Sequence, residues 1–80
     1  MTEPNTSQEP RDHFAHCAQV FGGIPATSRR LGIDERAIRR FINGERPVSK
    51  ELLEDVAKAL GVLIAEATSA EGFIVEALRR

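Results

Sequence analysis

Residues 26–47 read ATSRRLGIDERAIRRFINGERP, and this stretch decides the fold. A small residue, Ser28, is followed four positions later by Gly32, and the apolar residues Ile38 and Phe41 come after that glycine. A glycine between two short segments permits positive φ and therefore a sharp turn. Only a small side chain fits at Ser28, where the two segments approach each other. The stretch predicts two short helices joined by a tight turn.

The ends of both helices are marked in the sequence. Pro25 suits a first helical turn, where its missing N–H would have no partner in any case. Asp34 is the expected N-cap of the second helix, because its carboxylate can accept a hydrogen bond from an early backbone N–H. Gly44 ends that helix. We therefore expect helices over residues 25–31 and 35–43.

Two further helices are expected, one on each side of this pair. Residues 11–21 form the first, which ends at Gly22. Ser49 is expected to cap the second, which ends at Gly61. Apolar residues at helical spacing in the first are Phe14, Cys17, Ala18 and Phe21. The expected buried side of the second comprises Leu52, Leu53, Val56, Ala57 and Leu60.

The sequence after Gly61, VLIAEATSAEGFIVEALRR, allows two interpretations. The favoured one is helical, with a break at Thr68–Ser69 where Ser69 caps a fifth helix. The alternative is a hairpin of VLIAEA and FIVEAL around a polar turn. In both, Phe73, Ile74 and Leu78 are too apolar for a free tail, so we expect them to form a dimer contact.

These segments predict an all-α, five-helix fold, with a helix-turn-helix DNA-binding domain over residues 11–62 and the fifth helix in the C-terminal segment. Residues 1–10, with two prolines and mostly polar side chains, are expected to be a disordered tail. Residues 63–80 are the expected dimerisation segment. The apolar content of 41% includes four phenylalanines but neither Trp nor Tyr. That composition suits one aliphatic core and leaves little aromatic surface for stacking single-stranded bases.

The charge is divided unevenly along the chain, although the net charge is only −1. Residues 29–50 carry six arginines and one lysine against three acids, which gives +4. Residues 1–28 carry −2 and residues 51–80 carry −3. The positive charge therefore coincides with the predicted turn, which indicates an anionic macromolecule such as nucleic acid as partner.

Other classes of site find little support. His13, His16 and Cys17 have helical spacing, but a structural zinc needs four ligands and no second cluster exists, so no metal is expected. Three carboxylates, at Glu51, Glu54 and Asp55, lie without a nucleophile or phosphate loop nearby, so neither an enzyme nor a cofactor is expected. No small-molecule ligand is evident.

No targeting or membrane segment is recognisable. The chain has no apolar run of about 18 residues, and its first residues lack the pattern of a signal peptide. The single cysteine cannot form an intramolecular disulfide. We therefore expect a cytoplasmic, nucleoid-associated protein.

The second helix of the pair presents a polar face once Ile38 and Phe41 turn inward. That face comprises Glu35, Arg36, Arg39, Arg40 and Asn43. Arginine matches guanine O6 and N7 with two hydrogen bonds, and such a pair contributes about 1–3 kcal/mol of discrimination. The alternative is a helical bundle whose arginines form an ordinary solvated face.

Residues 12–62 resemble the Cro/λ-repressor-like (XRE) helix-turn-helix family. The family pattern is carried by Ser28, Leu31, Gly32, Ile33, Asp34, Ile38, Phe41, Asn43 and Gly44. The sequence departs from it at Ile24–Pro25, where the family often has Gln, and at Ile42, where it often has Glu. The missing Gln argues against adenine reading and favours a half-site that contains guanine.

The resemblance implies a sequence-specific regulator that binds double-stranded DNA as a homodimer on an inverted repeat, most simply a repressor. The base-reading residues would be Arg36, Arg39, Arg40 and Glu35. The phosphate contacts would be Asn43, Arg46, Lys50 and Arg29. In size the chain is similar to phage Cro-type and anti-CRISPR-associated repressors. The alternatives are an antitoxin-like or adaptor protein that binds through its C-terminal segment, and an activator that contacts RNA polymerase.

Overall fold

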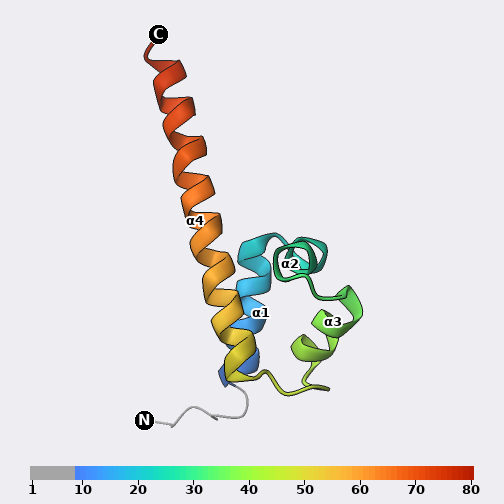
Figure 1. Cartoon of the computed structure of the whole chain (residues 1–80). Helices are drawn as coiled ribbons and strands as arrows, with labels where there is room; N and C mark the ends of the chain where they lie inside the picture. Colours follow the sequence, from blue (N-terminus) through green and yellow to red (C-terminus); the bar gives the residue numbers. More distant parts are fainter. Residues whose placement is uncertain (1–8) are drawn as a thin grey trace, which may run out of the picture.

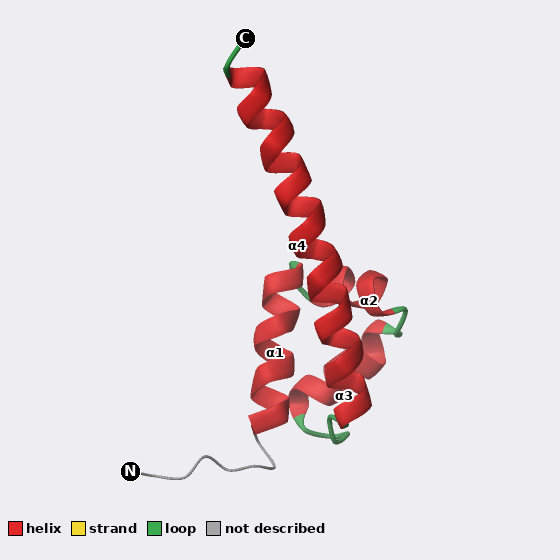
Figure 2. Cartoon of the chain, turned by 60° about the vertical axis from the view of Figure 1, so that its left-hand side comes forward, coloured by secondary structure: helices red, strands yellow, loops and turns green. Residues whose placement is uncertain are grey.

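The computed structural model describes residues 9–80, which form four α-helices and no strand (Figure 1). The helices are α1 (Glu9–Phe21), α2 (Ile24–Leu31), α3 (Glu35–Asn43) and α4 (Lys50–Leu78). The first three pack together with the lower half of α4, and we call this unit, residues 9–63, the head. The rest of α4 projects from the head, and we call residues 64–78 the arm (Figure 2). The predicted all-α class is confirmed.

The core of the head is aliphatic and aromatic, as expected. Its buried members are Phe14, Ala18, Phe21, Ile38, Phe41, Leu52 and Val56. Phe14 of α1 and Phe41 of α3 meet edge to face, with their ring centroids 5.5 Å apart, an arrangement that aromatic pairs prefer. Ala57 is exposed, so its predicted place on the buried side of α4 is wrong.

The predicted caps of α3 and α4 are confirmed. Asp34 accepts a hydrogen bond from the backbone N–H of Arg36 at 3.4 Å, and Ser49 accepts one from Leu52 at 3.0 Å. Each such cap contributes about 1 kcal/mol because it satisfies a backbone donor that the helix itself leaves unpaired. α3 has the predicted bounds. The caps therefore fix where the second helix of the pair begins.

The predicted bounds at the N-terminus need a correction. α1 begins at Glu9, so Glu9 and Pro10 are helical and are not part of a disordered tail. Proline is tolerated in the first turn, where its lack of an N–H removes no helical hydrogen bond. The rest of the predicted tail lies outside the described residues. α2 begins at Ile24, one residue before its predicted start.

The C-terminal third differs most from the expectation. α4 runs without interruption through Gly61, Thr68 and Ser69, so the fifth helix, the break at Ser69 and the alternative hairpin are all wrong. A glycine inside a helix costs about 1 kcal/mol relative to alanine but does not by itself end the helix. Nothing lies within 4 Å of a Cβ built on Gly61, so no tertiary contact turns the chain there.

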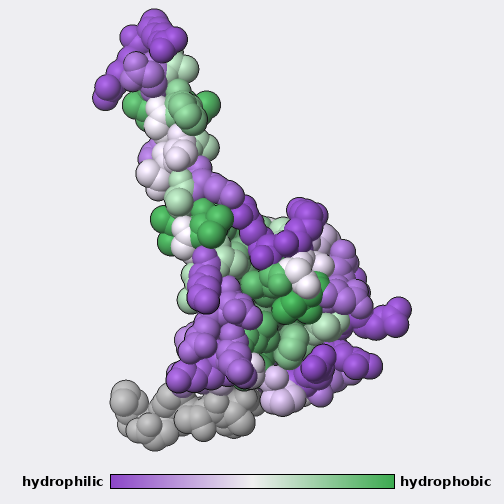
Figure 3. Space-filling view, in the orientation of Figure 1, coloured by the Kyte–Doolittle hydropathy of each residue, from purple (hydrophilic) through white to green (hydrophobic). Residues whose placement is uncertain are grey.

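The arm exposes its apolar side chains. The predicted dimer residues Phe73, Ile74 and Leu78 are 76%, 61% and 80% exposed. Apolar side chains are visible along the arm in Figure 3. The radius of gyration is 15.6 Å, against about 11–12 Å for a compact chain of this size. The arm thus lacks the packing that usually stabilises an apolar helix. Among residues 9–80, no helix combines the length and apolarity needed to span a membrane.

Candidate nucleic-acid interface

The turn between α2 and α3 is closed by Ser28 and Gly32. Gly32 has φ of +68° and its N–H donates to the Ser28 carbonyl at 2.8 Å. The Ser28 hydroxyl donates to the carbonyl of Ile33, on the far side of the turn. Positive φ is readily available only to glycine, so the predicted role of Gly32 is confirmed. The short side chain of Ser28 also supplies a hydrogen bond across the turn.

Thr27 is a structural residue that the sequence reasoning missed. It is fully buried, and its hydroxyl donates to the carbonyls of Gly23 at 2.7 Å and Ala18 at 3.3 Å. These bonds join the start of α2 to the end of α1. The sequence around Thr27 does not indicate that it is buried. Its hydrogen-bond acceptors are backbone carbonyls, which every residue has, so no partner side chain marks the site.

The solvent face of α3 carries the predicted polar side chains. Arg36, Arg39, Arg40 and Asn43 are all exposed, because Ile38 and Phe41 face the core from the opposite side. The buried pair anchors the helix at two points one turn apart. The face of α3 defined by these four exposed residues, which we call the α3 face, is therefore held rigidly against the head.

Glu35 is placed differently from the arginines. It is half-buried, and its Oε1 lies 3.5 Å from Nη2 of Arg39, one turn along the helix. Exposed ion pairs contribute only about 0–1 kcal/mol. The pair can therefore orient Arg39 in the free protein and still release its guanidinium to a stronger anionic partner.

The other predicted phosphate contacts lie at the C-terminal end of α3 and at the start of α4. The Arg46 guanidinium carbon lies 5.2 Å from the centroid of the Phe41 ring, within cation–π distance. Asn43 Nδ2 is 3.5 Å from Glu45 Oε2, and Lys50 is exposed at the start of α4. The ring contact holds the Arg46 guanidinium against Phe41, at the C-terminal end of α3.

Arg11 also belongs to this end of the molecule, and the sequence reasoning did not select it. Its guanidinium lies against Gly44, so closely that a Cβ at that position would collide with it. A cation beside the last turn of a helix is favourable because carbonyl groups converge there. No sequence signal connects two residues so far apart, since only the packing of α1 on α3 brings them together.

The two arginines of α2 have different environments. Arg29 is exposed, as predicted. Arg30 Nη2 donates to Glu66 Oε1 of the arm at 2.7 Å. This hydrogen bond raises the pKa of Arg30 and holds the pKa of Glu66 below its ordinary value. Of the two cations, Arg29 is the one with no carboxylate partner within residues 9–80.

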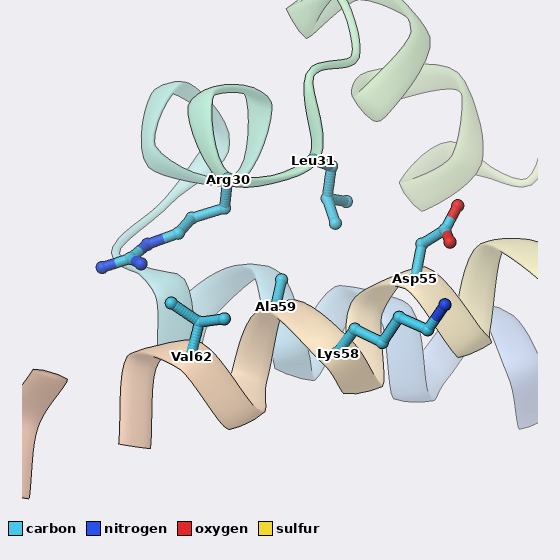
Figure 4. A pocket seen from close by; sticks show the side chains of 6 residues that line it. All are labelled: Arg30, Leu31, Asp55, Lys58, Ala59 and Val62. Carbon is cyan, nitrogen blue, oxygen red and sulfur yellow. The ribbon is translucent and has the colours of Figure 1, made fainter. Parts of the chain in front are cut away.

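A shallow groove of about 380 Å³ lies beside Arg30, between α2 and α4 (Figure 4). Its lining comprises Arg30, Leu31, Asp55, Lys58, Ala59 and Val62. The groove is open to solvent along its length. In Figure 4 Arg30 extends over the Val62 end of the groove, toward the base of the arm.

The residues considered as metal ligands are dispersed. Cys17 is half-buried against the core, and His13 Nε2 lies 3.6 Å from Glu9 Oε1 on the surface of α1. Within residues 9–80, no three His, Cys, Asp or Glu side chains are grouped as a metal site would require. Cys17 accordingly behaves as a small core side chain.

The geometry assembles two short helices, a glycine turn and a rigid helix face with three exposed arginines. A family model described as helix-turn-helix matches residues 26–66, just over half of the chain. No curated protein and no solved structure matches the chain. The matched region begins at the start of the sequence stretch that decides the fold and ends at Glu66, the partner of Arg30. The chain belongs to the helix-turn-helix family of the Cro/λ-repressor-like (XRE) type, whose members are DNA-binding transcription regulators and typically not enzymes.

Proposed function

We propose that this regulator binds double-stranded DNA sequence-specifically, as a dimer on an inverted repeat, and represses transcription by occluding a promoter. The observation that carries the proposal is the α3 face, where three exposed arginines and Asn43 project from a helix anchored by Ile38 and Phe41. A helix of this kind fits the major groove, and rigid placement is what base reading requires.

The proposed contacts divide into two classes. Arg36, Arg39 and Arg40, with Glu35 beside them, read base edges, and arginine favours guanine. The phosphate contacts are Arg29, Asn43, Arg46 and Lys50. The position of Arg46 against Phe41, at the C-terminal end of α3, supports this division, because phosphate contacts fix the register of a helix that reads bases. Residues 51–80 carry a net charge of −3 and supply none of these contacts.

The dimer is proposed to form through the segment 63–80, with Phe73, Ile74 and Leu78 at the contact. Their exposure in a single copy supports this, since a contiguous apolar helix surface marks an interaction site. Two recognition helices separated by a whole number of helical turns of about 34 Å would then meet the same face of the duplex. Such a repressor would act in the cytoplasm, associated with the nucleoid.

Selection from a random DNA pool tests the DNA-binding proposal. We expect a palindromic motif with guanines at fixed spacing. In fluorescence anisotropy on that motif, Arg39→Ala or Arg40→Ala should abolish specific binding, whereas Arg79→Ala, an exposed arginine at the far end of α4, should not. Specific binding that survives the combined replacement of Arg36, Arg39 and Arg40 would refute base reading by α3.

The dimer has its own test. Ile74→Asp with Leu78→Asp should give a monomer by analytical ultracentrifugation and much weaker binding to the palindrome. The head should stay folded, because neither side chain packs on it. An unchanged mass would refute dimerisation through the arm.

The exposed arm also favours a second candidate function, an antitoxin-like or adaptor protein whose arm binds a different protein. In that case the same double variant would leave DNA affinity unchanged. An activator that contacts RNA polymerase is distinguished by in vitro transcription from a promoter carrying the selected motif, where added protein would raise the transcript level instead of lowering it.

A further inference from the structure

One apolar face of α4 continues from the head into the arm. Within the head it consists of Val56, Leu60 and Leu63, which are buried or half-buried against the core. In the arm it continues at alternating spacings of four and three residues, through Ala67, Ala70, Ile74 and Ala77, all of which are exposed. This spacing is the seam of a coiled coil. The same helix face is therefore covered in the head and uncovered in the arm.

Because the head covers this face on the lower half of α4, a partner helix can lie on the arm only in certain orientations. α1 runs beside the lower half of α4 and, with α2, covers this face there (Figures 1 and 2). A helix packed on the seam would lie about 8–10 Å from the α4 axis. A second copy running parallel would have to place its own Lys50–Leu60 where α1 of this copy lies. An antiparallel copy places its head beyond the tip of the arm and avoids that clash.

We propose that the arm pairs with the arm of a second copy in antiparallel orientation, an inference that deepens the dimer of the proposed function. Ala67 faces Ala77 of the partner subunit, and Ala70 faces Ile74 of the partner subunit. Alternating layers of small and large side chains let the two helices approach closely. Beside the seam, Phe73 lies against Phe73 of the partner subunit, near the two-fold axis.

The charged residues that flank the seam distinguish antiparallel from parallel pairing of the two arms. In the antiparallel register Glu66, on one flank of the seam, lies beside Arg80 of the partner subunit, and symmetry repeats this pair. Like charges meet at Glu71 with Glu71 of the partner subunit, and Glu66 also keeps Arg30 of its own copy as a partner. In a parallel pair Glu66 would instead lie beside the partner's Glu71, twice, and Arg80 of neither copy would have an acidic neighbour across the seam. Flanking charges of this kind set the orientation of coiled coils.

The surface available is of the right order for a dimer. Ile64, Phe73, Ile74 and Leu78 are each more than 60% exposed. Together they offer on the order of 500 Å² of apolar surface per copy. The seam alanines and the stems of the flanking charged residues add to this. Standard interfaces bury about 800 Å² per partner, so pairing of the arms alone approaches the area of a specific dimer.

Crosslinking between single cysteines tests the orientation, in the full-length chain with Cys17→Ser to remove the native thiol. Ala67→Cys and Ala77→Cys are each prepared alone and then mixed, and all samples are treated with a short bis-maleimide. We expect covalent dimers in the mixture and almost none in either sample alone. In the proposed register, Ala67 of one copy and Ala67 of the partner subunit are ten residues apart along the helices, and the same holds for Ala77. That distance is about 15 Å, which is too far for the reagent.

Each other result overturns the proposal in a recognisable way. Dimers of Ala67→Cys alone would show a parallel pair. A dimeric mass in ultracentrifugation without crosslinks would show a different register or interface, and a monomeric mass would show that the arm does not bind a second copy. As a charge test, Arg80→Glu should weaken the dimer several-fold, whereas Glu76→Arg, on the side of α4 away from the seam, should not. No DNA is present in these measurements, so their failure is separate from failure of operator binding.

Discussion

Arg30 of α2 and Glu66 of α4 are joined by a hydrogen-bonded ion pair of 2.7 Å, which links the first helix of the helix-turn-helix to the base of the arm. The two residues are 36 positions apart in sequence. Because Glu66 lies beyond Gly61, the pair exists only if α4 continues past that glycine. It therefore adds a side-chain contact between α2 and the arm to the covalent continuity of α4.

The pair predicts a pH-dependent contribution to stability. Arg30 holds the pKa of Glu66 below its ordinary value, so the contribution is present above about pH 4.3, the usual glutamate value, and is lost as the pH falls through the lowered pKa. Glu66→Gln should lower the thermal midpoint at pH 7 and converge with the wild type in strong acid. Glu76→Gln, at an exposed glutamate on the arm with no ion-pair partner within residues 9–80, is the control. Equal effects of the two changes would contradict a specific role for the pair.

Gly44→Ala should destabilise the head more than Gly32→Ala does. Both glycines have positive φ, +82° and +68°, which costs an alanine about 1–2 kcal/mol. At Gly44 the new methyl group also collides with the Arg11 guanidinium, whereas at Gly32 it meets nothing within 4 Å. Chemical denaturation measures both changes.

Gly72→Ala, in an open position on the arm, controls for the glycine pair. It removes a glycine from a helix interior and should be neutral or stabilising by up to about 1 kcal/mol. Equal losses of unfolding free energy for Gly44→Ala and Gly32→Ala would mean that the Arg11 side chain moves aside at no cost, so that its contact with Gly44 does not stabilise the head.

Thr27→Val should destabilise the head by about 0.5–1.5 kcal/mol, the usual net contribution of a hydrogen bond. Valine keeps the shape but removes the hydroxyl that donates to Gly23 and Ala18. Both carbonyls retain a backbone partner, so no acceptor is left unpaired. Thr68→Val, at an exposed site on the arm, should change the unfolding free energy little. A loss at Thr68 as large as that at Thr27 would contradict this account of the α1–α2 junction.

Lys50→Ala should weaken DNA binding by a similar factor on every sequence. It should also reduce the slope of log affinity against log salt by about 0.9, the value for one phosphate contact. Lys58→Ala, on the same helix but in the groove beside α2, should leave the slope unchanged. A change in sequence preference without a change in slope would instead assign Lys50 to base reading.

The local pattern was sufficient to predict the helix-turn-helix itself. Gly32, Asp34 and Ser49 act through neighbours within five residues, so backbone sterics and capping determine them without knowledge of the rest of the chain. The alternation of buried Ile38 and Phe41 with arginines likewise follows from helical periodicity. This is why α3 and its exposed face agreed with expectation.

The remainder depended on contacts that distant segments make or fail to make. Gly61 by itself does not determine whether α4 ends there, because the chain leaves the helix at a glycine only where tertiary packing stabilises the turn. Nothing lies within 4 Å of a Cβ built on Gly61. The placement of Arg11 beside Gly44, the burial of Thr27 and the pairing of Arg30 with Glu66 each require two helices already docked. The sequence by itself therefore determined the local turn, the caps and the arginine face, because these depend on short-range sterics and hydrogen bonds. Only the tertiary structure decided the length of α4 and the exposure of its arm, because those depend on long-range packing.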